Sequence, residues 1–142
     1  VHSFFENKEQ FTQDLETVRE NHHRIIEDLF KASNTEILLK VNALFDSVLT
    51  FLSTTDADEY SLIYDQVVSV GELVSTTIIS HYMQQEGMKN TWLDARECIK
   101  TDAYFRDANL DWNDTETAIQ KAAQGKSTLI SQGFIGSSPN GY

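Results

Sequence analysis

The sequence predicts an α/β protein with a helix-rich N-terminal half and a small parallel sheet in its C-terminal half. Apolar residues recur at helical spacing through most of the chain before Gly87. Beyond Gly87 the pattern changes to short extended segments with one helical segment between them. Strands that alternate with helices are joined by crossover connections, which give parallel strands with helices on the faces of the sheet.

Composition limits the classes of function. The chain has 142 residues, 40% of them hydrophobic, which fits one globular domain. Its net charge of −11 would repel phosphate groups, so we expect no nucleic-acid partner. We see no basic cluster and no apolar run long enough to span a bilayer, so we expect no membrane partner. The single cysteine, Cys98, suits a reducing, cytoplasmic location because it cannot form an internal disulfide.

Two amphipathic helices are predicted before residue 58. The first runs from Phe4 to Phe30, with Ser3 as its N-cap, and the second runs through Ile37 to Leu52. A short break between them predicts an antiparallel helical hairpin. His22 and His23 are adjacent and therefore point about 100° apart on a helix. We expect no metal site there, and no metal-ligating residues elsewhere in the chain.

A third, longer helix is predicted from Glu59 to Glu86. Asp56 or Asp58 is expected to cap its start, and Gly87 is expected to end it. Its middle is apolar nearly all the way round, which predicts burial on more than one side.

The most informative pair in this helix is Gly71-Glu72. A glycine in a helix interior costs about 1 kcal/mol relative to alanine, so close approach of another backbone or a ligand is one reason for Gly71. Glu72 lies among Val70, Leu73 and Val74, and a half-buried carboxylate usually has a cationic partner, such as a substrate ammonium group. The alternative is a surface glutamate beside a tolerated glycine.

Three short strands and one helix are predicted after Gly87. The strands are Thr91–Ala95, Asn109–Trp112 and Ser127–Phe134, the last being the clearest. The helix is Asp114–Gln124, capped by Asn113 or Asp114.

A second informative run, Gln132-Gly133-Phe134-Ile135-Gly136, follows the last predicted strand. Open parallel sheets bind ligands beyond the carboxyl ends of their strands. Glycines there let backbone N–H groups turn toward an anion, and the alternative is a simple exit turn. Asp94 and Arg96 would face the same edge, where such a pair more often forms an ion pair that pins a turn.

Taken together, four runs resemble the aspartate kinase family. They are Ser69–Ser75 (Ser-Val-Gly-Glu-Leu-Val-Ser), Trp92–Arg96 (Trp-Leu-Asp-Ala-Arg), Thr101-Asp102 and Gln132–Gly136, and Asp65 also fits the family's helix. The resemblance is strong over Tyr60–Gly141. Residues 1–58 resemble only the variable helical insert of that family. The resemblance thus divides one amino-acid-kinase domain into this insert (1–58) and a second part (59–142), which holds the Gly-Glu helix and part of the substrate lobe.

The resemblance implies a three-layer α/β/α amino-acid-kinase fold and a function. Members phosphorylate the side-chain carboxylate of L-aspartate with Mg-ATP, on the route to lysine, threonine and methionine. By this resemblance Glu72 would accept the substrate's α-ammonium group, and Gly133, Phe134 and Gly136 would line the aspartate pocket. An anionic group that receives an ammonium, and backbone donors that receive carboxylates, agree with this assignment.

Two family motifs, Lys-Phe-Gly-Gly-Thr-Ser and Gly-Arg-Gly-Gly-Ser-Asp, do not occur in this sequence. They supply the positive charge on which phosphoryl transfer depends, so we expect no catalytic residue, no cofactor-binding residue and no activity in this chain by itself. The chain begins at Val1 and ends in a turn signal, Pro139–Tyr142, so we expect a fragment of a longer protein. Unpaired strand edges predict homo-oligomers. The alternative function is a non-catalytic, acidic helical interaction module.

Overall fold

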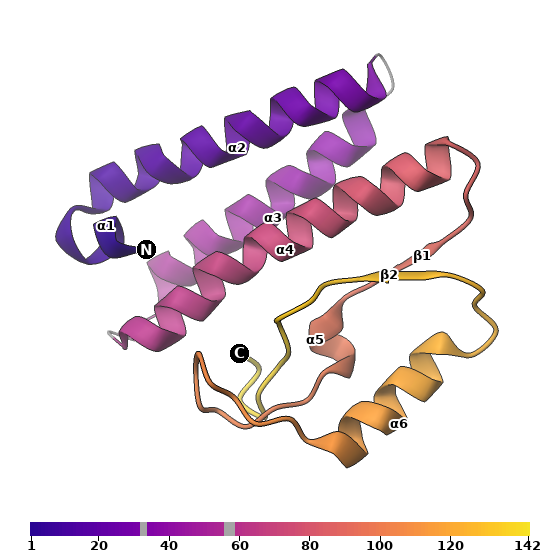
Figure 1. Cartoon of the computed structure of the whole chain (residues 1–142). Coiled ribbons are helices and arrows are strands. Elements are labelled where there is room, and N and C mark those ends of the chain that lie inside the picture. The colour runs from indigo at the N-terminus through magenta and orange to yellow at the C-terminus, as the bar shows by residue number, and fades with distance from the viewer. Residues whose placement is uncertain (32–33, 56–58) are drawn as a thin grey trace.

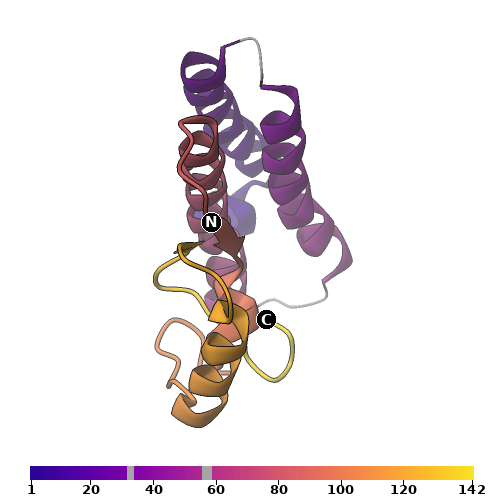
Figure 2. The same cartoon turned by 90° about the vertical axis from the view of Figure 1, so that its right-hand side faces the viewer.

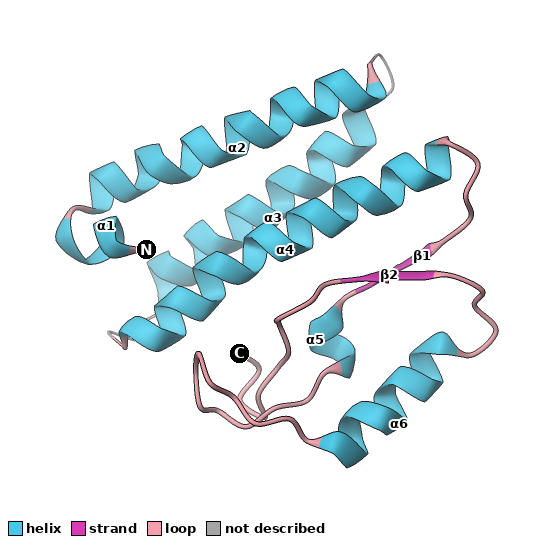
Figure 3. Cartoon of the chain, viewed as in Figure 1, coloured by secondary structure: helices cyan, strands magenta, loops and turns pink. Residues whose placement is uncertain are grey.

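A computed structural model describes residues 1–31, 34–55 and 59–142 (Figure 1). Figure 3 separates its helices, strands and loops by colour. In chain order the elements are α1 (His2–Glu6), α2 (Lys8–Phe30), α3 (Thr35–Thr54), α4 (Tyr60–Gln85), β1 (Thr91–Leu93), α5 (Ala95–Cys98), α6 (Trp112–Ala123) and β2 (Leu129–Ser131).

The long helices α2, α3 and α4 form the helical half and share one core. Figures 1 and 2 show α2 and α3 running antiparallel, as the sequence predicts, with α4 packed beside α3. Apolar side chains at helical spacing point inward from all three helices and exclude water, which is the main stabilising term of such a bundle. The buried core residues are Phe11, Leu15, Ile26, Phe30, Ile37, Val41, Phe45, Val48, Val70, Val74 and Ile78.

The start of the first helix differs from the prediction. The helix is interrupted at Asn7, which separates α1 from α2. The extended backbone of Asn7 (φ −154°) lets its side chain accept hydrogen bonds from the N–H groups of Glu9 and Gln10. Asn7 is therefore the N-cap of α2, and the prediction of Ser3 is wrong. The Ser3 hydroxyl instead donates to the carboxylate of Asp14 at 2.8 Å. Both residue types are good caps, and the pattern of apolar residues does not choose between them.

Helix α4 is confirmed within one residue at each end, and it joins the two halves of the molecule. It packs against α3 on one side and against β1 and β2 on another, which agrees with the predicted burial on more than one side. The proposed caps Asp56 and Asp58 lie outside the described residues. Gly87 follows the helix with a φ of +81°, a left-handed conformation that favours glycine.

The sheet consists of two parallel strands. Thr91, Trp92 and Leu93 of β1 pair with Leu129, Ile130 and Ser131 of β2. In Figure 1, α4 lies on one side of these strands and α6 on the other, so the small sheet is layered between helices. The predicted parallel sheet is confirmed over the described residues, but with shorter strands than the sequence predicts.

The predicted strand at Asn109–Trp112 is wrong. Leu110 makes a single antiparallel bridge to Thr101, and Trp112 already opens α6. The side chain of Asp111 accepts a hydrogen bond from the N–H of Asp114, so Asp111 caps this helix rather than Asn113 or Asp114. A carboxylate cap favours helix over strand here because it also interacts with the positive end of the helix dipole.

By length and composition, α3 and α4 could each cross a membrane. Windows within them have mean hydropathies of 1.4 and 1.3. Our expectation that no apolar run is long enough is therefore wrong by this criterion. Core helices pass the same test, and both helices contribute to the shared core, so the finding is weak evidence for a membrane.

Candidate functional site

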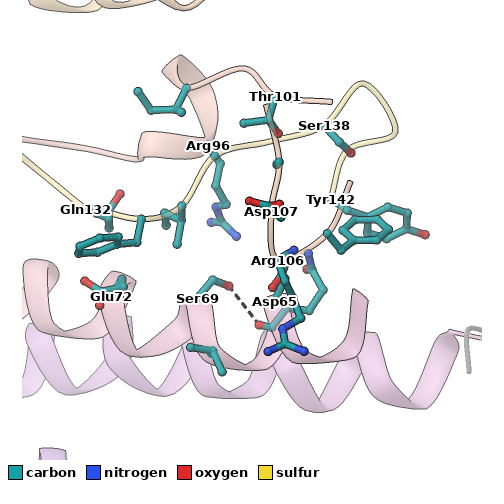
Figure 4. A pocket seen from close by; sticks show the side chains of 18 of the residues that line it. Asp65, Ser69, Glu72, Arg96, Thr101, Arg106, Asp107, Gln132, Ser138 and Tyr142 are labelled. Carbon is teal, nitrogen blue, oxygen red and sulfur yellow. Dashed lines mark hydrogen bonds between the residues drawn. The ribbon is translucent and has the colours of Figure 1, made fainter. Parts of the chain in front are cut away.

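A pocket of about 860 Å³ opens between α4 and the loops that follow β1 and β2. This volume is in the range of small-molecule sites, which is about 300–1,000 Å³. The face of α4 that lines it includes Asp65, Ser69 and Glu72, and the opposite wall includes Arg96 and the predicted run Gln132–Gly136. Figure 4 shows Glu72 and Gln132 at one end of the pocket and Ser138 and Tyr142 toward the other.

Glu72 and Phe134 line this same pocket, although they are far apart in the sequence. Glu72 is partly buried on α4, between the buried residues Val70, Leu73 and Val74. Its carboxylate has no hydrogen-bond or ion-pair partner among the side chains that the structure describes. A partly desolvated carboxylate without a partner is a favourable place for a cation to bind.

Gly71 lies on the exposed side of α4, about 100° around the helix from Glu72. A Cβ atom there would meet no atom of the described chain within 4 Å. The prediction that another backbone approaches Gly71 is therefore wrong within residues 1–31, 34–55 and 59–142. Gly71 does not line the pocket either, so a ligand in this pocket does not explain the glycine.

The loop after β2 presents an aromatic ring to solvent. Phe134 is fully exposed, at 105% of its reference area, and its φ of +63° is in the left-handed region. A non-glycine residue in that region costs on the order of 1–3 kcal/mol, and such residues cluster at binding sites. At Phe134 the fold therefore leaves an apolar ring in water and keeps the backbone in an unfavourable conformation. Both features suggest a role in binding.

The two glycines of this loop differ in their surroundings. A Cβ at Gly133 would meet nothing within 4 Å, whereas a Cβ at Gly136 would lie 2.9 Å from both Cγ2 and the carbonyl oxygen of Ile99. The chain runs close to the segment after α5 at this point, because the N–H of Ser137 donates to the Ile99 carbonyl oxygen at 2.8 Å. Gly136 therefore has a packing reason that is independent of any ligand.

Replacing Gly136 by alanine is expected to destabilise the protein by about 1–3 kcal/mol, because the new methyl group overlaps the backbone oxygen of Ile99, which cannot move alone. The measurement is the midpoint of urea unfolding. Gly133→Ala is the matched control and should shift that midpoint little, since the space is open and the φ of Gly133 is not left-handed. Equal shifts in the two variants would contradict the packing reason.

Asp94 and Arg96 form the ion pair that pins the turn after β1, as the sequence analysis anticipated. The Asp94 carboxylate caps α5 by accepting the Arg96 N–H at 3.0 Å, and the Arg96 guanidinium donates to it at 2.9 and 2.6 Å. Burial raises the pKa of Asp94, but the hydrogen bonds from Arg96 and its charge outweigh burial and hold the pKa below its ordinary value. Arg96 lines the pocket with its charge already paired.

Asp94→Asn is expected to make the free energy of unfolding depend less on pH in the acid range. Because the folded-state pKa is lowered, the carboxylate stabilises the fold above its ordinary pKa of about 4, and this contribution is lost as the pH falls through the folded-state value. Asparagine can still cap the helix, so the variant loses mainly the charged pair with Arg96, which we expect to cost about 1 kcal/mol at pH 7 and less at pH 3. Urea unfolding at both pH values measures this, with the exposed cap variant Asp111→Asn as control. An unchanged pH dependence in Asp94→Asn would contradict it.

The structure adds pocket residues to which the sequence analysis gave no role. The loop after α5 reaches α4, where the N–H of Arg106 donates to the Asp65 carboxylate at 2.8 Å and its guanidinium lies 4.8 Å from the ring centre of Tyr64. Gln132 stands next to the predicted glycine, and its side chain is buried. In the sequence, Gln132 could have been identified as a polar side chain at the end of an apolar strand. Arg106 could not, because its contacts are with residues far away along the chain.

The helices and the parallel strand pair together have an aspartokinase-like α/β fold. Solved structures of E. coli aspartokinase III match it: the complex with lysine and aspartate (T-state) has a TM-score of 0.79 and 23% identity, and covers 95% of this chain and 30% of that chain. The complex with aspartate and ADP (R-state) has a TM-score of 0.78 and 24% identity, with the same coverage. At this identity the likeness establishes the fold, and the predicted fold class is confirmed.

The present chain thus spans 30% of the length of the aspartokinase III chains that it matches. No protein-family model matches the sequence, and a search of curated proteins finds no significant match. The roles of individual residues must therefore be inferred from the geometry of the pocket.

Proposed function

We propose that this chain is part of an aspartate kinase. Residues 1–58 would be its helical insert, and residues 59–142 its Gly-Glu helix and part of its substrate lobe. The whole enzyme would transfer a phosphoryl group from Mg-ATP to the side-chain carboxylate of L-aspartate, giving 4-phospho-L-aspartate for lysine, threonine and methionine biosynthesis. The fold shared with E. coli aspartokinase III over 95% of the chain supports this, together with the sequence runs that resemble the family.

The observation that carries the proposal is that an unpaired carboxylate, Glu72, and the glycine-flanked Phe134 line one pocket. Glu72 would accept the α-ammonium group of L-aspartate in a charge-assisted hydrogen bond. Gly133, Phe134 and Gly136 would form the wall around the rest of the substrate. Since Arg96 is already paired with Asp94, its charge is not free for a substrate carboxylate. Backbone N–H groups of the loop and the guanidinium of Arg106, which also lines the pocket, are the donors that remain.

We do not expect this chain to bind Mg-ATP well by itself. Among the described residues no group of three or more histidine, cysteine, aspartate or glutamate side chains could hold a metal ion. Mg²⁺ in nucleotide sites is bound through carboxylates together with the substrate's phosphates, and the family motifs that contact the phosphates do not occur in this sequence. We assign the nucleotide to other parts of the enzyme. A cytoplasmic location and a homo-oligomeric state belong to the same proposal.

We expect the isolated chain to bind L-aspartate without turning it over. In NMR titrations, L-aspartate should shift the amide signals of Gly133, Phe134 and Gly136 but not those of α2, which does not line the pocket. With Mg-ATP and L-aspartate the chain should release no ADP above background, because the two motifs that supply positive charge for phosphoryl transfer in the family do not occur in this sequence. E. coli aspartokinase III is the positive control. Shifts confined to other regions would contradict the proposed pocket, and steady ADP release would contradict the predicted inactivity.

A further inference from the structure

The side chain of Gln132 connects three separate segments at the Glu72 end of the pocket. It is 8% exposed, and its Oε1 accepts the N–H of Ala95, at the start of α5, at 2.7 Å. Its Nε2 donates to the hydroxyl of Thr76 on α4, also at 2.7 Å. Because a backbone N–H can only donate, the orientation of the amide group is fixed by these two partners.

The Thr76 hydroxyl carries the connection to Glu72. It donates to the Glu72 carbonyl oxygen at 2.8 Å and accepts hydrogen bonds from Gln132 and from the indole N–H of Trp92, the latter at 3.1 Å. One donor and two lone pairs are all that a hydroxyl has, so the group is saturated. A continuous chain of hydrogen bonds thus joins the backbone of Glu72 to the residue directly before Gly133.

We propose that Gln132 is a positioning residue that holds the Gly133–Gly136 loop at a fixed place opposite Glu72. The inference rests on the proposed function, since it concerns the same pocket. Gln132 touches no reacting atom in this role; it ties the exit of β2 to α4 and to the start of α5. Phe134 is exposed and strained, so it has little packing of its own to hold it, and the restraint comes from its buried neighbour.

Glutamine suits this position because one neutral side chain must both accept and donate inside the fold. Leucine has a similar size but would leave the Ala95 N–H without its partner, and a buried donor without a partner is costly. A buried network of this kind has a specific geometry only while every member is satisfied. The loop should therefore loosen when either end of the Gln132 amide loses its partner.

The test uses Gln132→Leu and the nearly isosteric Thr76→Val, which break the network from opposite ends, and Thr76→Ser, which keeps the hydroxyl. Gln120→Leu is the matched control, because Gln120 donates only to the exposed carboxylate of Glu116. Two readouts are measured: amide hydrogen exchange at Ala95 and at Ser137, whose N–H donates to Ile99 directly after the loop, and the dissociation constant for L-aspartate. The indole N–H signal of Trp92 reports the network directly, and Trp112→Phe assigns it, since the chain has 2 tryptophans.

We expect Gln132→Leu and Thr76→Val to speed exchange at these amides about tenfold and to raise the L-aspartate dissociation constant by a similar factor. Thr76→Ser and Gln120→Leu should resemble the parent chain, and the double variant should be less than additive. Unchanged exchange in both Gln132→Leu and Thr76→Val would overturn the inference. If the parent chain fails to bind L-aspartate, the proposed function fails, and the exchange data still decide whether Gln132 positions the loop. Should Gln132→Leu not fold, Thr76→Val decides alone.

Discussion

Replacement of Glu72 by glutamine is expected to abolish the preference of the pocket for L-aspartate over succinate. The two ligands share both carboxylates, and succinate lacks only the α-ammonium group. A hydrogen bond to a charged group contributes about 1.5–3 kcal/mol. Because Glu72 is partly exposed and solvent screens its charge, we expect the lower end of that range, or about a tenfold preference in the parent chain. Calorimetric or NMR titrations with both ligands measure it.

The glutamine variant keeps the shape of the side chain and removes its charge, so it should bind succinate as well as the parent chain does, or better. Glu86→Gln is the matched control, because Glu86 is an exposed carboxylate just after the same helix and does not line the pocket. A Glu72→Gln variant that still prefers L-aspartate would show that the ammonium group binds elsewhere. This experiment also distinguishes a substrate pocket from an acidic interaction surface. On such a surface Glu72 and Glu86 would contribute alike, so the two variants should behave in the same way.

Regular, repeated patterns made the helices and the last strand predictable. The bounds of α4 follow from its long run of apolar residues and the glycine after it. Burial in the structure follows most of these residues, although Ile79 is half exposed and the polar Ser80 is buried. Ser127–Phe134 is rich in features of a buried strand, and β2 lies within it. The pairing of Glu72 with Phe134 came from a family resemblance, since no periodicity relates residues so far apart.

The errors fall where a single side chain decides the local structure. Asn7 interrupts an otherwise continuous helical pattern because its side chain can accept two backbone N–H groups, and Asp111 starts a helix where the apolar pattern suggests a strand. Gly136 and Gln132 owe their roles to contacts across the fold, with Ile99 and with Thr76. Spacing along one sequence carries no information on such contacts. The sequence could therefore place Gly136 and Gln132 near the site, but it could not show which contacts require a glycine or a glutamine there.

Two phenylalanines should give opposite results when replaced by alanine. Phe45 is 1% exposed in the helical core, where its ring contacts the Arg19 guanidinium and the His22 ring. Phe45→Ala removes this buried volume and should lower the free energy of unfolding by about 3–5 kcal/mol. Phe134 is fully exposed, so Phe134→Ala removes no core contact and should change it by less than about 0.5 kcal/mol. Urea unfolding of both variants measures this.

The contrast matters because stability and ligand binding then have separate origins in this chain. If the exposed ring of Phe134 contacts the ligand, Phe134→Ala should weaken L-aspartate binding and leave the unfolding curve unchanged. Phe45→Ala should instead lower the unfolding midpoint and, while the protein stays folded, bind L-aspartate as the parent chain does. A large loss of stability in Phe134→Ala would mean that its ring packs against the protein in solution. That result would remove the argument that this residue is kept exposed for binding.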